Sequence, residues 1–243
     1  MKKQDALSVE KTIEFAKPYY QHKTTFSGGD LLEHCIAVAR QAEVIAAKLY
    51  QDVRKDFCPD STKESIAAIM HGSVLHDVLR VGGCAFEQIA ENTTVQVAAM
   101  VADVTRDFRL VETKRDMEYR GRLSQSPVSS QILATADVIC TAKEALNFLA
   151  VSGLDAVSKS KKVLAQLDGD LLAVHAASRY YVLRLYVHAA RNMLLDVSTK
   201  IKECRHNAKL VRLANQNTKS LQERVAKKSR VAAKRKDLRN DTQ

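Results

Sequence analysis

The stretch IAAIMHGSVLHDVL, residues 66–79, decides the fold class. The apolar content of this stretch is high, which predicts a helix at the centre of the core. The adjacent His76 and Asp77 stand near the end of this helix. A charged carboxylate there is costly to bury unless it is paired or bound to a cation. The stretch therefore indicates a core helix that leads into a polar site.

Composition extends the helical interpretation to the whole chain. The 243 residues are 46% hydrophobic and include only 8 Gly and 3 Pro, a balance that favours helices over a turn-rich β fold. No convincing strand alternation and neither the Rossmann nor the P-loop glycine signature is present. We expect helices over residues 8–20, 31–55, 61–81, 86–90, 94–103, 113–123, 127–149 and 199–236, with two or three more over 154–197 around a turn at Asp168-Gly169-Asp170.

The chain divides into three expected parts. Residues 1–152 form a first domain that ends at Ser152-Gly153, residues 153–215 a helical extension, and residues 216–243 a basic tail. The net charge is +10, and residues 219–239 alone hold nine Lys or Arg against two acidic residues. Such a tail is either a solvated arm or a salt-sensitive contact for nucleic acid or another acidic partner. Its apolar stripe is too short and irregular to predict a coiled coil.

Cysteine usage and hydropathy indicate a cytoplasmic protein without a membrane span. Five cysteines occur with no CxxC pair, which fits a reducing compartment. The first residues lack a signal-peptide apolar core. Three arginines interrupt the most apolar window, residues 171–197, and argue against a membrane helix.

Two further residues join the polar pair as candidates for a metal site. Asp137 lies inside the apolar run ILATADVI, residues 132–139, and His34 lies near the start of the second expected helix. Imidazoles and carboxylates that converge from separate helices can hold a divalent ion with open positions for phosphate chemistry. Each residue also has an ordinary interpretation, as a satisfied core histidine, a helix-end pair or a buried salt-bridge carboxylate. His71, five residues before His76, is expected to face elsewhere.

A longer series of motifs runs in order along residues 10–150. It comprises Phe15-Ala16-Lys17, Ser27-Gly28, His34, Ala37-Val38-Ala39, Val74-Leu75-His76-Asp77-Val78, Phe86-Glu87-Gln88-Ile89, Val97-Ala98, Val104-Thr105-Arg106, Glu118-Tyr119-Arg120 and Leu133-Ala134-Thr135-Ala136-Asp137. In these motifs the chain resembles the HD-domain phosphohydrolases, and most closely the hydrolase domain of RelA/SpoT-like enzymes and small alarmone hydrolases. The resemblance implies an all-α HD-domain bundle with one Mn²⁺-like ion on His34, His76, Asp77 and Asp137.

The chain departs from that family at the positions that would activate water and bind substrate. Arg80 and Val81 occupy the positions of the family's Glu-Asp pair, so a general base or acid is missing from its expected place. Thr25 replaces a basic residue, for which Lys23 is a nearby substitute, and Thr141 replaces an asparagine. Arg80 either contacts a substrate phosphate or is a solvated helix end.

Three functional hypotheses follow. The first is a metal-dependent phosphohydrolase that acts on a nucleotide or alarmone-like phosphate ester, in which Asp77 is both a ligand and a water-orienting catalytic group and Lys23 and Arg80 bind substrate. The second is a nucleotide-binding or regulatory module that has lost catalysis with the Glu-Asp pair. The third is a nucleic-acid-associated or assembly role for the basic tail, and self-association into a homo-oligomer is compatible with each hypothesis.

Overall fold

The computed structural model describes residues 8–52, 59–81 and 83–240. These residues form α-helices, one 3-10 helix (η1) and an isolated bridge between Thr24 and Asp30, which confirms the all-α prediction. The elements are α1 (Val9–Tyr20), α2 (Leu31–Asp52), α3 (Pro59–Leu75), α4 (Val78–Val81), α5 (Phe86–Asn92), α6 (Val95–Val104), α7 (Glu112–Gln125), α8 (Val128–Ser152), η1 (Gly153–Ala156), α9 (Val157–Ala177) and α10 (Tyr181–Asn240). The last three residues of the second predicted helix, 53–55, lie outside the described residues.

Short polar residues define where several helices begin. Ser8 and Thr94 accept backbone N–H bonds at the starts of α1 and α6. The Asp30 carboxylate accepts a hydrogen bond from the Glu33 amide at 3.0 Å, ahead of α2. Asp30 thus fixes the start of α2, which sets His34 one turn inside that helix.

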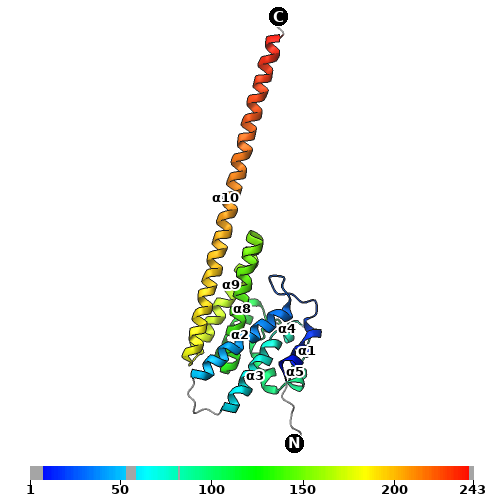
Figure 1. Ribbon diagram of the computed structural model, residues 1–243, viewed down its shortest axis with the longest axis vertical. Helices are drawn as coiled ribbons and strands as arrows, with labels where there is room; N and C mark the ends of the chain where they lie inside the picture. The colour runs from blue at the N-terminus through cyan, green and yellow to red at the C-terminus, as the bar shows by residue number, and fades with distance from the viewer. Residues whose placement is uncertain (1–7, 53–58, 82, 241–243) are drawn as a thin grey trace.

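Helix α2 packs against both α3 and α8 at the centre of the molecule (Figure 1). One buried apolar cluster joins α2 and α8 to α9 and α10, and a second joins the start of α2 to α1, α3, α5 and α6. The first two turns of α2 therefore lie where the two clusters meet. His34 is in this segment.

The helix predicted over residues 61–81 is interrupted, so that part of the prediction is wrong. α3 ends at Leu75, and His76 and Asp77 form a turn before α4. The backbone amides of Arg80 and Val81 donate hydrogen bonds to the Asp77 carbonyl at 3.0 Å each. Because of the turn, two adjacent side chains line the same pocket, although on a continuous helix they would point about 100° apart.

The turn predicted at Asp168-Gly169-Asp170 is also wrong, because α9 passes through it without a break. A Cβ at Gly169 would overlap the guanidinium group of Arg120. Asp170 is ion-paired with Arg106 and Arg120. The glycine therefore serves a close approach of α7 to α9, and the chain leaves the helix only at Ser178.

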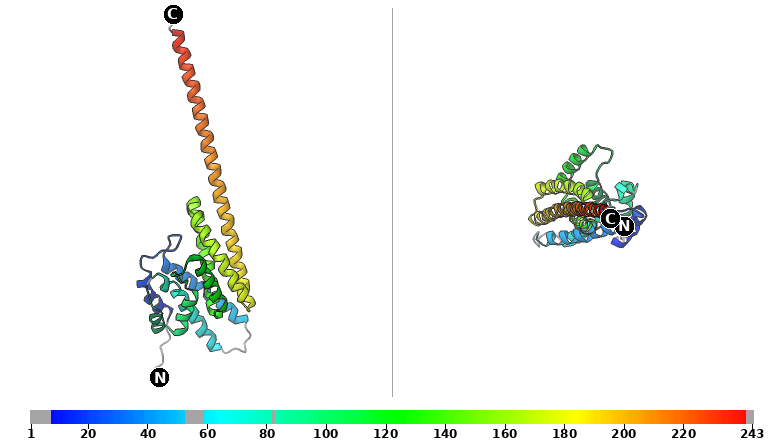
Figure 2. Two further views of the ribbon diagram at one scale, coloured as in Figure 1. Left: turned by 180° about the vertical axis from the view of Figure 1, so that it is seen from behind. Right: turned by 90° about the horizontal axis from the view of Figure 1, so that it is seen from above.

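Helix α10 is one continuous element of 60 residues, so the predicted boundary between residues 197 and 199 is wrong. No glycine or proline occurs in it, and the buried Val197 and Ile201 carry its apolar stripe across the predicted boundary. Its first part packs against α8 and α9. The remainder extends well beyond the rest of the molecule (Figures 1 and 2).

Three predictions concern the organisation of the chain: its domain boundaries, its lack of a membrane span and its reduced cysteines. The division of the chain at residues 152 and 215 stays a prediction, and α9 and the first part of α10 share an apolar cluster with α2 and α8. No helix among the described residues combines the length and hydrophobicity needed to cross a membrane. Four cysteines in the described part of the chain are free thiols: Cys35, Cys84, Cys140 and Cys204.

Candidate metal centre

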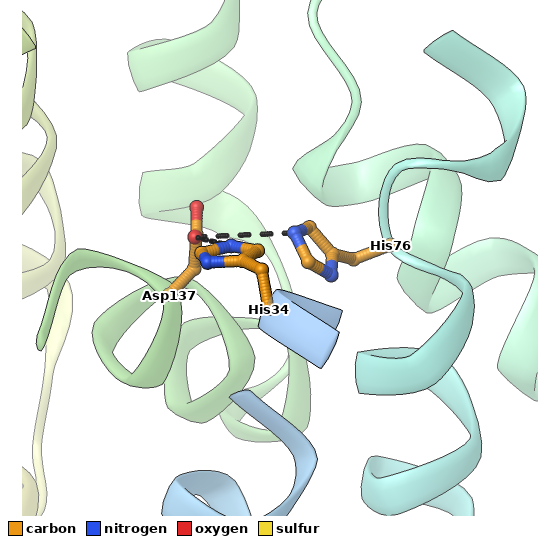
Figure 3. Close-up of side chains that lie close together, drawn as sticks. All are labelled: His34, His76 and Asp137. Carbon is orange, nitrogen blue, oxygen red and sulfur yellow. Dashed lines mark hydrogen bonds and ion pairs between the residues drawn. The ribbon is translucent and has the colours of Figure 1, made fainter. Parts of the chain in front are cut away.

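Three of the four predicted ligands converge from three separate segments. His34 comes from α2, His76 from the turn after α3, and Asp137 from α8, and their ligand atoms all lie within 4.8 Å of one another (Figure 3). The Asp137 Oδ1 atom lies 3.1 Å from His34 Nε2 and 3.9 Å from His76 Nε2. Both imidazoles are buried. Three of the four predicted ligands therefore form one compact cluster.

The second nitrogen of each imidazole also faces an acceptor. His76 Nδ1 lies 2.8 Å from the carbonyl oxygen of Ser73. His34 Nδ1 lies 2.5 Å from Glu144 Oε1. With a proton on each Nδ1, both Nε2 atoms are free to bind a cation beside Asp137.

The ionisable groups of this cluster shift one another's pKa values. Burial by itself lowers the pKa of His34, but hydrogen bonds to Asp137 and Glu144 outweigh it and raise the pKa to about 10. Burial likewise lowers the pKa of His76, and the neighbouring Cys35 and Asp77 raise it to about 10. The two imidazoles hold the pKa of Asp137 well below its usual range against the opposing effect of burial. Because the pKa values of both imidazoles are raised, protons compete with a cation for this cluster.

Asp77 lies at the edge of this cluster, held by Arg80. The Arg80 Nε and Nη2 atoms donate to the two Asp77 carboxylate oxygens at 2.6 and 2.5 Å. Asp77 Oδ2 is 3.9 Å from His76 Nε2. Burial raises the Asp77 pKa, but the charges of His76 and Arg80 outweigh it and lower the pKa. The predicted fourth ligand is thus close to the cluster but paired with a cationic side chain.

The cluster opens into a pocket of about 460 Å³. Arg80 lines this pocket, whereas the exposed Lys23 is not among the described residues that line it, although Thr24 and Thr25 are. The structure therefore brings one of the two predicted substrate-binding residues to the site. The pocket lining is His34, His76, Asp77, Arg80, Asp137, Thr141 and Glu144 on the side of the cluster, with Thr24, Thr25, Phe26, Leu31, Val104, Thr105, Arg106, Phe108, Tyr119, Val163, Gln166, Leu167 and Asp170 around the rest.

A partly buried ion-pair network joins α7 and α9 to Arg106, which lies between α6 and α7 and lines the pocket. Arg106 donates to Asp116 at 2.7 Å and to Asp170 at 2.5 Å, and Arg120 donates to Asp170 at 3.3 Å. The Arg106 guanidinium carbon lies 4.0 Å from the centre of the Tyr119 ring. Because these charges hold one another in place, the network presents a fixed polar surface to a ligand.

Sequence reasoning missed Glu144 and this network. A signal for Glu144 was present, because Asp137, Thr141 and Glu144 are spaced by four and three residues and so share one face of α8. Thr141 confirms that face, since its hydroxyl donates to Asp137 Oδ1 at 3.1 Å. The Asp170 network had no local signal, because its partners lie 50 or more residues away along the chain. His71 bonds to Thr12 of α1 at 2.8 Å and lies outside the cluster, as predicted.

Comparisons with known proteins support the fold. No protein-family model matches the chain, and no curated protein matches it. Among solved structures, one described as "A metazoan ortholog of SpoT hydrolyzes ppGpp and plays a role in starvation responses" matches with a TM-score of 0.57 and 13% sequence identity. The match covers 75% of this chain and 92% of that chain. This likeness shows that the chain shares an all-helical fold with that protein, the fold that the sequence predicted.

The residues of the cluster fit a divalent metal ion. Two imidazoles and a carboxylate are a donor set that suits first-row transition metals. Their ligand atoms lie close enough together for one ion to contact all three after only small shifts. Both histidines are oriented through their second nitrogens, as metal-binding histidines usually are.

Proposed function

We propose that the chain is a metal-dependent phosphohydrolase that acts on a nucleotide or alarmone-like phosphate ester. One observation carries this proposal: the buried cluster of His34, His76 and Asp137 opens into a pocket, in a fold shared with a ppGpp hydrolase. Mn²⁺ is the ion we expect, because the resemblance implies it and the nitrogen and oxygen donors are compatible with it. The free thiols favour a reducing compartment such as the cytoplasm.

In this proposal the residues of the chain bind and orient the reacting groups. The ion, when bound, supplies Lewis acidity at the phosphoryl group and lowers the pKa of a nearby water. Asp77 is a ligand that also orients the attacking water. Arg80 lines the pocket beside it and contacts a substrate phosphate once Asp77 is released. Lys23, outside the lining of the pocket, binds the substrate at its rim.

The test is hydrolysis of a nucleotide panel that includes ppGpp, with Mn²⁺ present. We expect phosphate or pyrophosphate release by the wild-type protein and none by a His76→Ala, Asp77→Ala double variant. His206→Ala, at an exposed histidine on α10, is the matched control and should keep full activity. Activity that survives the double substitution would remove this hypothesis.

The alternative function is a nucleotide-binding module without catalysis. It is favoured by the ion pair in which Arg80, at the first position of the family's Glu-Asp pair, occupies the predicted ligand Asp77. Tight binding of a nucleotide without turnover in Mn²⁺, Mg²⁺, Zn²⁺ or Fe²⁺ would support this alternative. Robust turnover would eliminate it.

A nucleic-acid-associated role is the third candidate function, and it rests on α10. This helix extends beyond the body, and the part of the chain with nine basic and two acidic residues falls within its distal portion. A phosphate backbone is the polyanion that such a charge density matches. Deleting residues 216–243 should abolish salt-dependent binding of duplex DNA or RNA, measured by fluorescence anisotropy, and leave the metal centre intact. If the truncated protein binds as the full chain does, this role is wrong.

A further inference from the structure

The two histidines of the cluster are oriented by different kinds of acceptor. The carbonyl of Ser73, in the helical turn just before His76, faces His76 Nδ1 and is fixed by the backbone of α3. The acceptor for His34 Nδ1 is the carboxylate of Glu144, which belongs to a different helix. The orientation of the His34 imidazole therefore depends on a side chain that a single substitution can remove.

Glu144 is well placed to hold this imidazole. It lies seven residues, or two helical turns, after Asp137 on α8, so the His34 ring from α2 fits between two carboxylates on one face. Its second oxygen, Oε2, accepts a hydrogen bond from Ser27 Oγ at 3.3 Å. Ser27 is bonded in turn to the Thr25 hydroxyl at 2.9 Å. Glu144 thus connects the metal cluster to the loop that precedes α2.

A histidine binds a metal ion through an unprotonated nitrogen, so its remaining proton must sit on the other nitrogen. In His34 the atom that faces the cluster is Nε2, which lies 3.1 Å from Asp137 Oδ1. A carboxylate that accepts a hydrogen bond from Nδ1–H selects this tautomer and fixes the plane of the ring. It also makes the Nε2 lone pair a stronger ligand for the cation. The Ser73 carbonyl likewise selects the tautomer and fixes the ring plane of His76. It carries no full charge, so it strengthens Nε2 as a ligand less than a carboxylate does.

We propose that Glu144 is a positioning residue of the metal centre, which holds His34 in the tautomer and orientation that bind the cation. This inference rests on the proposed metal site and adds a residue to it. The Glu144 carboxylate contacts His34 Nδ1. The atoms that converge in the cluster are those of His34, His76 and Asp137, so Glu144 acts on the cluster through His34. A purely structural role, as a salt bridge between α2 and α8, would instead change stability and leave metal affinity unchanged.

The test is a calorimetric titration of the full chain with Mn²⁺. The variants are Glu144→Ala, which removes the acceptor, and Glu144→Gln, which keeps an oxygen acceptor without the charge. Glu33→Gln is the matched control, because Glu33 is an exposed glutamate next to His34 on α2. We expect Glu144→Ala to weaken Mn²⁺ binding by about 10–100-fold, Glu144→Gln to weaken it less, and Glu33→Gln to match the wild type.

A second readout follows the tautomer directly. Ring-nitrogen NMR of the protein loaded with diamagnetic Zn²⁺ should show His34 protonated at Nδ1 in the wild type and a mixture of tautomers in Glu144→Ala. Thermal unfolding of the metal-free variants checks that they fold. Mn²⁺ affinity of Glu144→Ala equal to that of Glu33→Gln, or a wild-type protein that binds no divalent ion, would overturn the inference. Nucleotide hydrolysis is measured separately, so weaker metal binding in a protein without turnover supports the role of Glu144 and removes only the proposed activity.

Discussion

Replacing Asp137 with asparagine tests the electrostatics of the cluster at the residue that faces both imidazoles. In the metal-free protein this carboxylate accepts from His34 at 3.1 Å and lies 3.9 Å from His76 Nε2. A hydrogen bond to a charged group contributes about 1.5–3 kcal/mol. The asparagine avoids the cost of burying a carboxylate, which offsets part of this contribution. We therefore expect Asp137→Asn to lower the free energy of unfolding by about 1–2 kcal/mol, or the melting temperature by about 2–8 °C.

The pH dependence of this loss is fixed in sign. The His34 pKa is raised from 6.5 to about 10 in the folded protein. Its protonated form therefore contributes stability that is fully present below pH 6.5 and is lost as the pH rises through about 10. Thermal unfolding of wild type and Asp137→Asn with EDTA should show the largest difference near pH 6.5 and a small one above pH 10. A difference that does not change with pH, or a variant as stable as the wild type at pH 6.5, would refute this reasoning.

Three further predictions concern the surroundings of the cluster. Arg80→Gln should strengthen Mn²⁺ binding about 5-fold in a calorimetric titration, because the ion pair that occupies Asp77 is worth about 1 kcal/mol; unchanged or weaker binding would contradict it. Mn²⁺ affinity should rise with pH as the imidazoles deprotonate, and titrations in buffers of different ionisation enthalpy should detect released protons; binding without proton release would disagree. Gly169→Ala should destabilise the protein by about 1–2 kcal/mol because it displaces Arg120, whereas Gly121→Ala, in open space on α7, should stabilise it by about 0.5–1 kcal/mol in thermal unfolding; equal shifts would show that Arg120 moves at no cost.

The sequence predicted the helices because apolar periodicity is a local signal. It predicted the convergence of His34, His76 and Asp137 because these residues belong to a series of motifs in a fixed order. Apolar periodicity identifies a helix without knowledge of its partners. The collinear motifs identified three predicted ligands whose ligand atoms lie within 4.8 Å of one another in the structure. The assignment of metal ligands, Asp77 included, stays a prediction.

Each failure concerns a feature that local sequence signals do not determine. Gly169 indicated a turn, but its missing side chain makes room for Arg120, whose position depends on a helix about 50 residues away. His76 and Asp77 were expected inside a helix, although the chain turns there. Glu144 was missed because its spacing from Asp137 indicates only a shared helix face, whereas its role depends on the approach of His34 from another helix.

The most direct test of the account is the metal content of the purified protein. Elemental analysis and titration with Mn²⁺ at pH 8 should find one divalent ion per chain in the wild type and none in a His34→Ala, Asp137→Ala double variant that remains folded. A folded wild-type protein that binds no divalent ion, or a double variant that binds one as tightly as the wild type, would contradict the central claim that this cluster is a metal centre.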